Sequence, residues 1–521
     1  MWILQMKSIL MELLVIRKTS DSWPIKENNN KITTMKISRE NAKMSDQYKN
    51  ELTNLITQLI AFTKTQAESF GAKSGDNEQS SYIFRNNTSL EAIAKEGGAY
   101  FGFISPEEEP SGPYHDLSLV IFPGPTKDDL WLVALVVGTL GFKNDYELAA
   151  MPGLRRFFES ILDPRAGFIK TSFLDINSRI PGDFTEKIPS LKKTISAYGK
   201  LLPACEIIDP KSDAGKNKIG AFLAVYAKVR GWATNKTHQN NIDEAINSCK
   251  KTVDINEENE VLQLIQRRKF VVLQGAPGTG KTRLAHLIAN KLNAKIFFTQ
   301  FHAETSYSDF IFGIKPDVDK QELHYRNKEG IFYEALRYSK DQSQTPTILI
   351  IDEINRANLA NVLGPIFYLF EYDVVDRVEI PILIGGDFQI AKIPDNFFVI
   401  ATMNTADRSL AMVDFALRRR FAWYTLYPHP LQNDLPGNRK FFSEDFNQLD
   451  KIFKWYAQPE ELVFQPGQSY FIAHDESEMF NRVRYELLPL IMEYLAEGIL
   501  LNAKEELILY FRERLGRDIE V

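Results

Sequence analysis

The sequence predicts an α/β fold for the C-terminal half of the chain, a parallel sheet flanked by helices and followed by a helical region. It predicts an α+β domain before it. Three observations lead to this fold class. From residue 256 onward, short apolar runs alternate with helical stretches, as in parallel sheets covered on both faces. A Gly-rich turn separates the first of these runs from the first helix. Before residue 240, neighbouring apolar runs are separated by Pro and Gly, which is typical of antiparallel hairpins.

The composition is that of an ordinary globular protein. The 521 residues are 44% hydrophobic and 25% charged, with a net charge of −6, which argues against wholesale disorder and fibrous structure. Because the chain is mildly acidic, any contact with nucleic acid needs a local basic patch. A size of roughly 150 residues per domain favours about three domains. We expect an extension over residues 1–43, an α+β domain over 44–240, an α/β domain over 255–425 and a helical domain over 426–521.

Cysteine content and hydropathy narrow the class of protein further. Only Cys205 and Cys249 occur, so a Cys-rich zinc site is excluded, and two reduced thiols in a cytosolic protein are expected. No apolar run approaches the ~20 residues that span a bilayer. The apolar start, residues 1–16, contains charges and lacks a cleavage site, so it fits a signal peptide poorly. One hypothesis is that Met35 or Met44 is the native start, which the intact mass of the natively expressed protein would test.

The N-terminal half predicts one long helix and several strands. Apolar residues recur at helical spacing over 46–70. Residues 100–104, 117–122 and 130–137 read as strands, the last two as a hairpin, and residues 147–200 as mostly helical with Pro interruptions. The aromatic residues of these strands could stack a nucleobase. A plain β core is the alternative, and Trp131, inside an apolar run, favours it.

The C-terminal half predicts strands at 269–274, 295–299, 347–351 and 397–402, with a helix over 281–292. Residues 440–521 read as helical. Since carboxyl ends of parallel strands meet at one sheet edge, polar residues that follow these strands should gather there.

The Gly-rich turn fits the P-loop pattern G-x-x-x-x-G-K-[ST], between a strand and a helix as that motif requires. Its glycines let backbone N–H groups converge on phosphate oxygens, beside the positive end of the helix. Lys281 is expected to reach the β- and γ-phosphates, and Thr282 to ligate Mg²⁺. The alternative is a Gly-rich turn without a ligand, which the flanking elements disfavour. The candidate nucleotide-binding residues are Gly275, Ala276, Pro277, Gly278, Thr279, Gly280, Lys281 and Thr282.

Two adjacent acids, Asp352 and Glu353, follow the apolar run 348–351, roughly 70 residues after the P-loop. Asp352 is expected to hold the Mg²⁺ shell as a further nucleotide-binding residue, and Glu353 to orient and polarise the attacking water. Alone, such a pair is more often a solvated strand end. After a P-loop, the catalytic interpretation is favoured.

Phosphoryl transfer also needs a polar group near the γ-phosphate and a cation for the developing charge. Asn404 directly follows the strand at 397–402 and is the candidate polar group. Arg418, Arg419 and Arg420 precede Phe421. One of them would act as an arginine finger in a neighbouring subunit, which predicts an oligomer with sites at subunit interfaces. The alternative is a solvated helix end.

These motifs resemble the AAA+ family and, within it, the McrB branch, the GTP-hydrolysing motors of modification-dependent restriction systems. The resemblance covers roughly residues 255–500. It rests on four segments besides the P-loop: the extended acidic element 352–358, the peptide Met-Asn-Thr-Ala-Asp-Arg-Ser at 403–409, the segment after the second strand at 301–311, and Gln-Ser-Tyr-Phe at 468–471.

The resemblance implies an AAA+ P-loop NTPase module with a C-terminal helical lid. It also implies Mg²⁺, a hexameric ring, and hydrolysis of GTP or ATP when an McrC-like nuclease subunit docks. DNA recognition would belong to the N-terminal domain. The choice between GTP and ATP stays open. The Asn-Lys-x-Asp clamp of small GTPases does not occur, and the most similar segment, residues 327–330, lacks its aspartate. No nuclease motif is evident, and Asp128 with Asp129 reads as surface charge, since the expected Glu-x-Lys is missing.

Three further residues and two other functions stay open. Arg356 is interpreted either as a contact to a neighbouring subunit or as a salt bridge. Arg408 is interpreted either as a contact to nucleotide or Glu353, or as a loop ion pair. His302 reads as loop structure. The functional alternatives are a remodelling ATPase that acts on protein complexes and a nucleotide-switched DNA-binding module, and the intact hydrolytic positions disfavour the latter.

Overall fold

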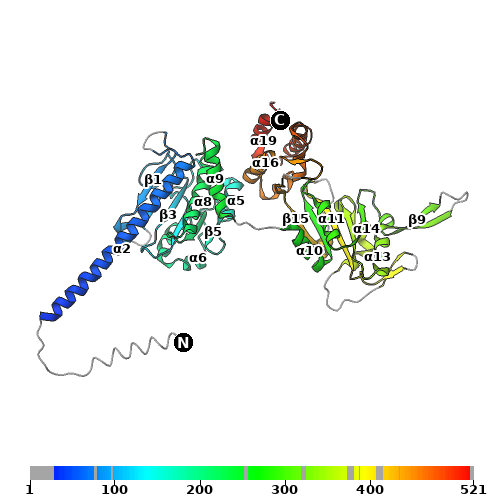
Figure 1. Ribbon diagram of the computed structural model, residues 1–521, viewed down its shortest axis with the longest axis horizontal. Helices are drawn as coiled ribbons and strands as arrows, with labels where there is room; N and C mark the ends of the chain where they lie inside the picture. The colour runs from blue at the N-terminus through cyan, green and yellow to red at the C-terminus, as the bar shows by residue number, and fades with distance from the viewer. Residues whose placement is uncertain are drawn as a thin grey trace, which may run out of the picture. The chain divides into compact units, whose positions relative to one another are not determined.

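The computed structural model describes residues 28–74, 79–94, 98–250, 256–317, 324–371, 381–385, 388–406, 415–432 and 435–516 (Figure 1). The apolar start discussed above and Arg408 lie outside these residues. The chain divides into two compact units, one of residues 1–146 and 161–250 and one of residues 147–160 and 251–521. The boundaries of the three domains that the sequence predicts, at residues 44–240, 255–425 and 426–521, stay a prediction. Within the described residues, no helix has both the length and the apolar character needed to cross a membrane.

The first unit contains a six-stranded antiparallel sheet in the order β1-β2-β3-β4-β6-β5. Its strands are β1 (Ile83–Asn87), β2 (Tyr100–Ile104), β3 (Leu117–Phe122), β4 (Trp131–Val137), β5 (Gly167–Ile169) and β6 (Ala204–Ile208). The hairpin expected at 117–137 is confirmed by the antiparallel pairing of β3 with β4. All residues of β3 and β4 are buried, so both faces of the sheet are covered.

The first unit also contains helices, some of which pack on the two faces of this sheet. They are α2 (Asn28–Ser69), α3 (Leu90–Ala94), α6 (Gly182–Glu186), α7 (Lys192–Tyr198), α8 (Asp213–Val229) and α9 (Lys236–Cys249), with α4 (Tyr146–Ala150) and α5 (Pro152–Ile161) at the division between the units. On one face α8 packs against β3, β4 and β6. On the other, Phe184 and Ile195 pack with Phe122 and Leu132. The helix expected over 46–70 is present but begins at Asn28. The region 147–200 contains helices as expected, but residues 162–181 hold no helix and include β5, a strand that the sequence did not predict.

The second unit is built on a five-stranded sheet in the order β15-β7-β14-β11-β8, in which every pair is parallel. Its strands are β7 (Phe270–Gly275), β8 (Lys295–Gln300), β11 (Thr347–Asp352), β14 (Phe397–Asn404) and β15 (Ala422–Leu426). The parallel sheet flanked by helices is therefore confirmed. Alternate residues of β11 face two separate cores: Ile348 and Ile350 pack in one, Leu349 and Ile351 in the other.

The helices of this unit pack on both sides of the sheet. On one side are α10 (Glu257–Arg268) and α11 (Lys281–Lys291), and on the other α12 (Tyr307–Phe310), α13 (Ile331–Asp341) and α14 (Leu359–Leu363). The sequence did not predict two added hairpins, β9 (Phe312–Asp317) with β10 (His324–Glu329) and β12 (Ile382–Gly385) with β13 (Phe388–Ile390). The helix α15 (Phe415–Arg420) leads into β15.

The C-terminal region is mainly helical, as expected. It contains α16 (Ser443–Tyr456), α17 (Glu476–Arg482), α18 (Leu488–Ala496) and α19 (Lys504–Leu515), and a short pairing of β16 (Lys440–Phe441) with β17 (Ile472–Ala473). These elements share one core, in which Phe446, Phe471 and Leu507 are buried. We call residues 435–516 the lid.

Candidate nucleotide-binding site

The P-loop follows an interior strand of the parallel sheet, because β7 lies between β14 and the edge strand β15. Gly278 and Gly280 have φ of 80° and 85°, which residues with a Cβ rarely adopt. Gly280 is the N-cap of α11 and offers no side-chain cap. The N–H groups of the first helical turn are therefore available to an anion, as the sequence predicted.

Lys281 folds back over the loop. Its ammonium group donates to the carbonyl oxygens of Gly275 at 3.0 Å and Ala276 at 2.8 Å. Burial lowers the pKa of Lys281 to about 8, although the carboxylates of Asp352 and Glu353 oppose this shift. A buried ammonium group that is held only by neutral carbonyls would gain from the arrival of phosphate charge.

The two oxygen donors expected near the metal are in contact. The Thr282 hydroxyl donates to Asp352 Oδ1 at 2.8 Å. The same Oδ1 accepts a hydrogen bond from the Thr402 hydroxyl at 2.6 Å. Thr402 lies on β14, directly beside β11, and sequence reasoning missed it because a single threonine at a strand end carries no distinctive pattern.

Glu353 has a left-handed backbone, with φ 54° and ψ 50°. For a residue other than glycine this is a strained conformation, and such strain is concentrated at functional sites. The Glu353 N–H donates to the Thr402 hydroxyl at 3.1 Å. Its carboxylate forms a close ion pair with Arg356, and a contact of Arg356 to a neighbouring subunit stays a prediction. His302 is exposed in a loop, as expected.

Asn404 ends β14 in register with Gly275, at the same sheet edge as the P-loop. Its side-chain oxygen accepts a hydrogen bond from the Ala406 N–H at 3.2 Å, and its backbone oxygen accepts one from Asn355 Nδ2 at 3.3 Å. Asn355 is buried, and its Oδ1 has no partner within the described residues. This residue links Glu353's turn to Asn404, a role that the sequence did not indicate.

The three arginines differ in their surroundings. Arg418 is exposed, with its guanidinium 5.4 Å from the centre of the Trp423 ring. Arg419 is 68% exposed and pairs with Glu371 at 3.0 Å. Arg420 is 10% exposed and pairs with the same Glu371 oxygen at 2.6 Å. The alternative of a solvated helix end therefore does not describe Arg420, because Glu371 supplies the charge that makes its burial tolerable.

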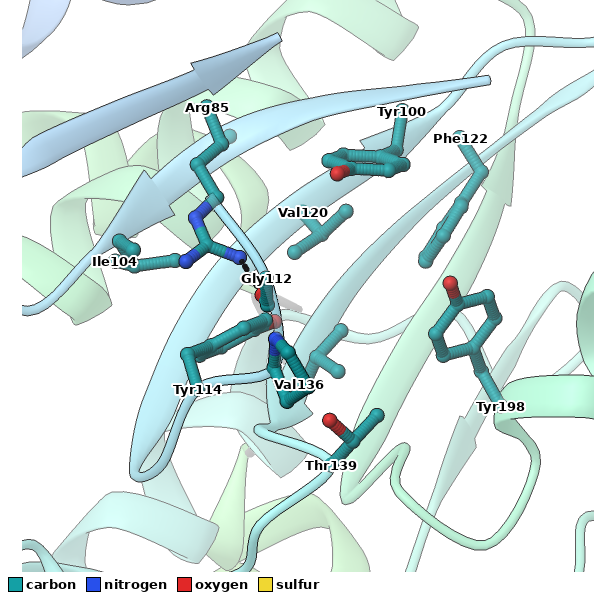
Figure 2. A pocket seen from close by; sticks show the side chains of 12 residues that line it. Arg85, Tyr100, Ile104, Gly112, Tyr114, Val120, Phe122, Val136, Thr139 and Tyr198 are labelled. Atoms are coloured by element: carbon teal, nitrogen blue, oxygen red, sulfur yellow. Dashed lines mark hydrogen bonds between the residues drawn. The ribbon is translucent and has the colours of Figure 1, made fainter. Parts of the chain in front are cut away.

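A separate cavity of about 230 Å³ lies in the first unit, over the faces of β2, β3 and β4 (Figure 2). Tyr100, Phe122 and Tyr198 lie along one side of it, and Arg85 and Tyr114 along the other. The centres of the Phe122 and Tyr198 rings are 5.4 Å apart. The aromatic strands thus form a core, since Trp131 is fully buried, but they also line a hollow.

The Arg85 side chain is held in place by contacts within the first unit. It donates to Gly112 O at 2.7 Å and lies 4.7 Å from the centre of the Tyr114 ring. Its Nε is buried without a partner in the described part of the chain. Burial raises the pKa of Tyr114 to about 12, so the cavity wall stays uncharged there. Asp128, by contrast, is 69% exposed and pairs with Lys211, as surface charge.

Residues 270–421 match the model for an AAA domain of the dynein-related subfamily. The chain is 34% identical over 261 residues to the type IV methyl-directed restriction enzyme EcoKMcrB subunit of Escherichia coli (strain K12), across 45% of this chain and 55% of that protein. Residues 270–421 therefore form an AAA domain, and the chain is McrB-like in sequence over 261 residues. The McrB-like chain is also 31% identical over 200 residues to the type II restriction enzyme BsuMI component YdiS of Bacillus subtilis (strain 168), across 31% of this chain and 58% of that protein.

The chain thus spans a little more than half the length of the curated relatives it matches. Among solved structures, the RuvB Holliday junction branch migration motor of Thermotoga maritima has a TM-score of 0.20 and 20% identity, covering 39% of this chain and 52% of that one. That likeness is too low to bear on function.

Proposed function

We propose that this McrB-like chain is a Mg²⁺-dependent nucleoside triphosphatase that hydrolyses GTP or ATP. The observation that carries the proposal is the 2.8 Å contact between Thr282 and Asp352, with Glu353 next in the chain. Oxygen atoms of a hydroxyl and a carboxylate are ligands that Mg²⁺ prefers, so these two residues fit the ion. When bound, Mg²⁺ would neutralise charge that develops on the phosphate oxygens.

The mechanism follows from what each side chain can do. The N–H groups of the P-loop and the Lys281 ammonium bind and orient the β- and γ-phosphates. Glu353 accepts a hydrogen bond from water and aligns it for in-line attack on the γ-phosphorus. Asn404, at the same sheet edge, offers an amide to hold that water or a γ-phosphate oxygen. The water oxygen bonds to the γ-phosphorus as the bond to the bridging oxygen breaks, and the water proton passes to Glu353, leaving nucleoside diphosphate and inorganic phosphate.

The test is turnover of GTP and of ATP, measured side by side with purified full-length protein and Mg²⁺, with and without its nuclease partner. We expect phosphate release from at least one nucleotide, and none with EDTA. Failure to hydrolyse either nucleotide in the presence of the partner would refute the proposal. The nucleotide that turns over faster identifies the base preference.

We further propose that the protein is the ring motor of a modification-dependent restriction complex. The names of the relatives support this, since one is a methyl-directed restriction enzyme subunit and the other a restriction enzyme component. The nuclease would be a separate, McrC-like subunit, and the motor a homo-oligomer, most simply a hexamer. An arginine supplied by each protomer to its neighbour's site is the feature that makes the ring necessary for turnover.

The arginines allow this to be tested. Because Arg418 is exposed and Arg420 pairs with Glu371, we expect Arg418→Ala to keep the free energy of unfolding within ~0.5 kcal/mol of the wild type and Arg420→Ala to lower it by about 1–3 kcal/mol.

If Arg418 is the arginine finger, Arg418→Ala should reduce turnover by ~10³-fold or more. Arg419→Ala serves as the comparison. Mixing Arg418→Ala with Glu353→Gln protein should restore part of the activity, since intact sites form between the two. No restoration would contradict an arginine acting between subunits.

We also propose that the N-terminal unit recognises DNA, with the cavity of Figure 2 as the contact for an unstacked base. The aromatic rings that line this cavity offer stacking surfaces for a base. Stacking of a base on an aromatic side chain is worth ~1–3 kcal/mol. We therefore expect Tyr198→Ala in the full chain to weaken binding of modified duplex DNA by ~5- to 100-fold. Tyr146→Ala, at an exposed site, should have no effect. Equal affinities in a mobility-shift titration would reject the cavity as the contact.

A further inference from the structure

The lid touches the P-loop through a set of hydrogen bonds to consecutive carbonyl groups. The Gly467 N–H donates to Pro277 O at 2.9 Å, and the Ser469 N–H donates to Gly278 O at 3.1 Å. Between these two lid residues, the Gln468 side chain donates from Nε2 to Thr279 O at 3.0 Å. Three successive carbonyls of the phosphate-binding loop are thus held from the lid.

Peptide geometry makes these bonds relevant to ligand binding. In a planar trans peptide, the C=O of one residue and the N–H of the next point in opposite directions. Holding the carbonyls of residues 277–279 toward the lid therefore aims the N–H groups of residues 278–280 away from it. Those are N–H groups that a P-loop directs at phosphate oxygens. The lid segment thus fixes the direction of these N–H donors through the carbonyl groups of the preceding residues.

The contact leaves little room for adjustment. A Cβ added at Gly467 would lie 2.1 Å from the backbone carbon of Gly278, and one added at Gly278 would lie 2.4 Å from Ser469 Oγ. The two backbones are thus in direct contact. Thr279 is 2% exposed and Gln468 is 7% exposed. A shift of the lid segment would break these hydrogen bonds together, and Gln468 supplies the one that a side-chain substitution can remove.

We propose that Gln468 is a positioning residue, which couples the placement of the lid to the orientation of the phosphate-binding amides. Displacement of the lid releases the carbonyls of residues 277–279, the amides lose their common direction, and affinity for the phosphates falls. This inference rests on the nucleotide binding proposed above. It makes docking of the lid on the P-loop one means by which the lid controls occupancy of the site.

The experiment removes the donor while keeping the volume of the side chain. Gln468→Met is nearly isosteric and has no N–H to give to Thr279 O. The matched control is Gln465→Met: Gln465 is also a buried glutamine of the lid, but its Nε2 donates to Asp450 at 3.0 Å, within the lid. Full-length proteins are titrated with fluorescent GDP and ADP, which bind the loop but cannot be hydrolysed. The melting temperature of each variant is measured in parallel.

We expect Gln468→Met to raise the Kd for the better-bound diphosphate by ~5- to 10-fold and Gln465→Met to change it less than twofold. In the absence of nucleotide, hydrogen exchange of the P-loop amides should be faster in Gln468→Met than in the control. Gln468→Ala serves if the Met variant does not fold. A Kd and exchange rates equal to those of the wild type would overturn the proposal. If the wild-type protein binds neither nucleotide, the proposed function itself fails, which is a different result.

Discussion

Glu353→Gln should bind nucleoside triphosphate as the wild type does while its turnover falls by at least ~10²-fold. The glutamine keeps the size of the side chain and the backbone contact to the Thr402 hydroxyl, which is made by the N–H. It removes the negative charge that would polarise water. Because Thr282 and Asp352 are unchanged, the metal-binding oxygens remain, so nucleotide should stay trapped in the site.

The measurement pairs phosphate release with titration of a fluorescent triphosphate. Glu334→Gln, an exposed acid on α13, provides the control and should leave both quantities unchanged. Hydrolysis by Glu353→Gln at the wild-type rate would show that Glu353 does not position the water. A loss of binding in that variant would instead indicate that Glu353 serves the fold of the site, for instance through its ion pair with Arg356.

Lys281→Ala should lose nucleotide binding, with a Kd at least ~100-fold higher, since it deletes the only cation of the loop in direct reach of the phosphates. In the free protein the ammonium group donates to two loop carbonyls, so the substitution also removes support for the turn. Calorimetric titration with GTP and with ATP measures the effect. Lys291→Ala is the control, because Lys291 lies at the far end of α11 and pairs with Glu258 on the surface. Unaltered affinity of Lys281→Ala would contradict the phosphate-binding role of the loop.

The core of the candidate site was predictable because it is encoded locally. A strand, a Gly-rich turn and a helix are contiguous in sequence, and their spacing carries the chemistry. The same holds for Asp352 and Glu353, which follow an apolar run. The parallel sheet was also predictable, since β7, β11 and β14 are mostly buried and read as continuous apolar segments.

What the sequence did not reveal depends on partners that are distant along the chain. Arg420 is buried because Glu371, 49 residues earlier, pairs with it. Gln468 meets Thr279 across 189 residues. The strand β5 has only three residues, and all three are partly buried. So short a segment is too brief to show an alternating pattern or a long apolar run in the sequence. Each is a consequence of tertiary packing, which local propensity does not record.

The phosphate-binding turn, the acids and the lid residues that hold the turn come from four separate stretches of the second unit, at residues 275–282, 352–355, 402–406 and 467–469. No excised fragment that stops at the end of β15 would retain the whole arrangement. Chimeras that graft this motor onto another recognition module should therefore keep residues 256–516 as a single block together with residues 147–160, which belong to the same unit.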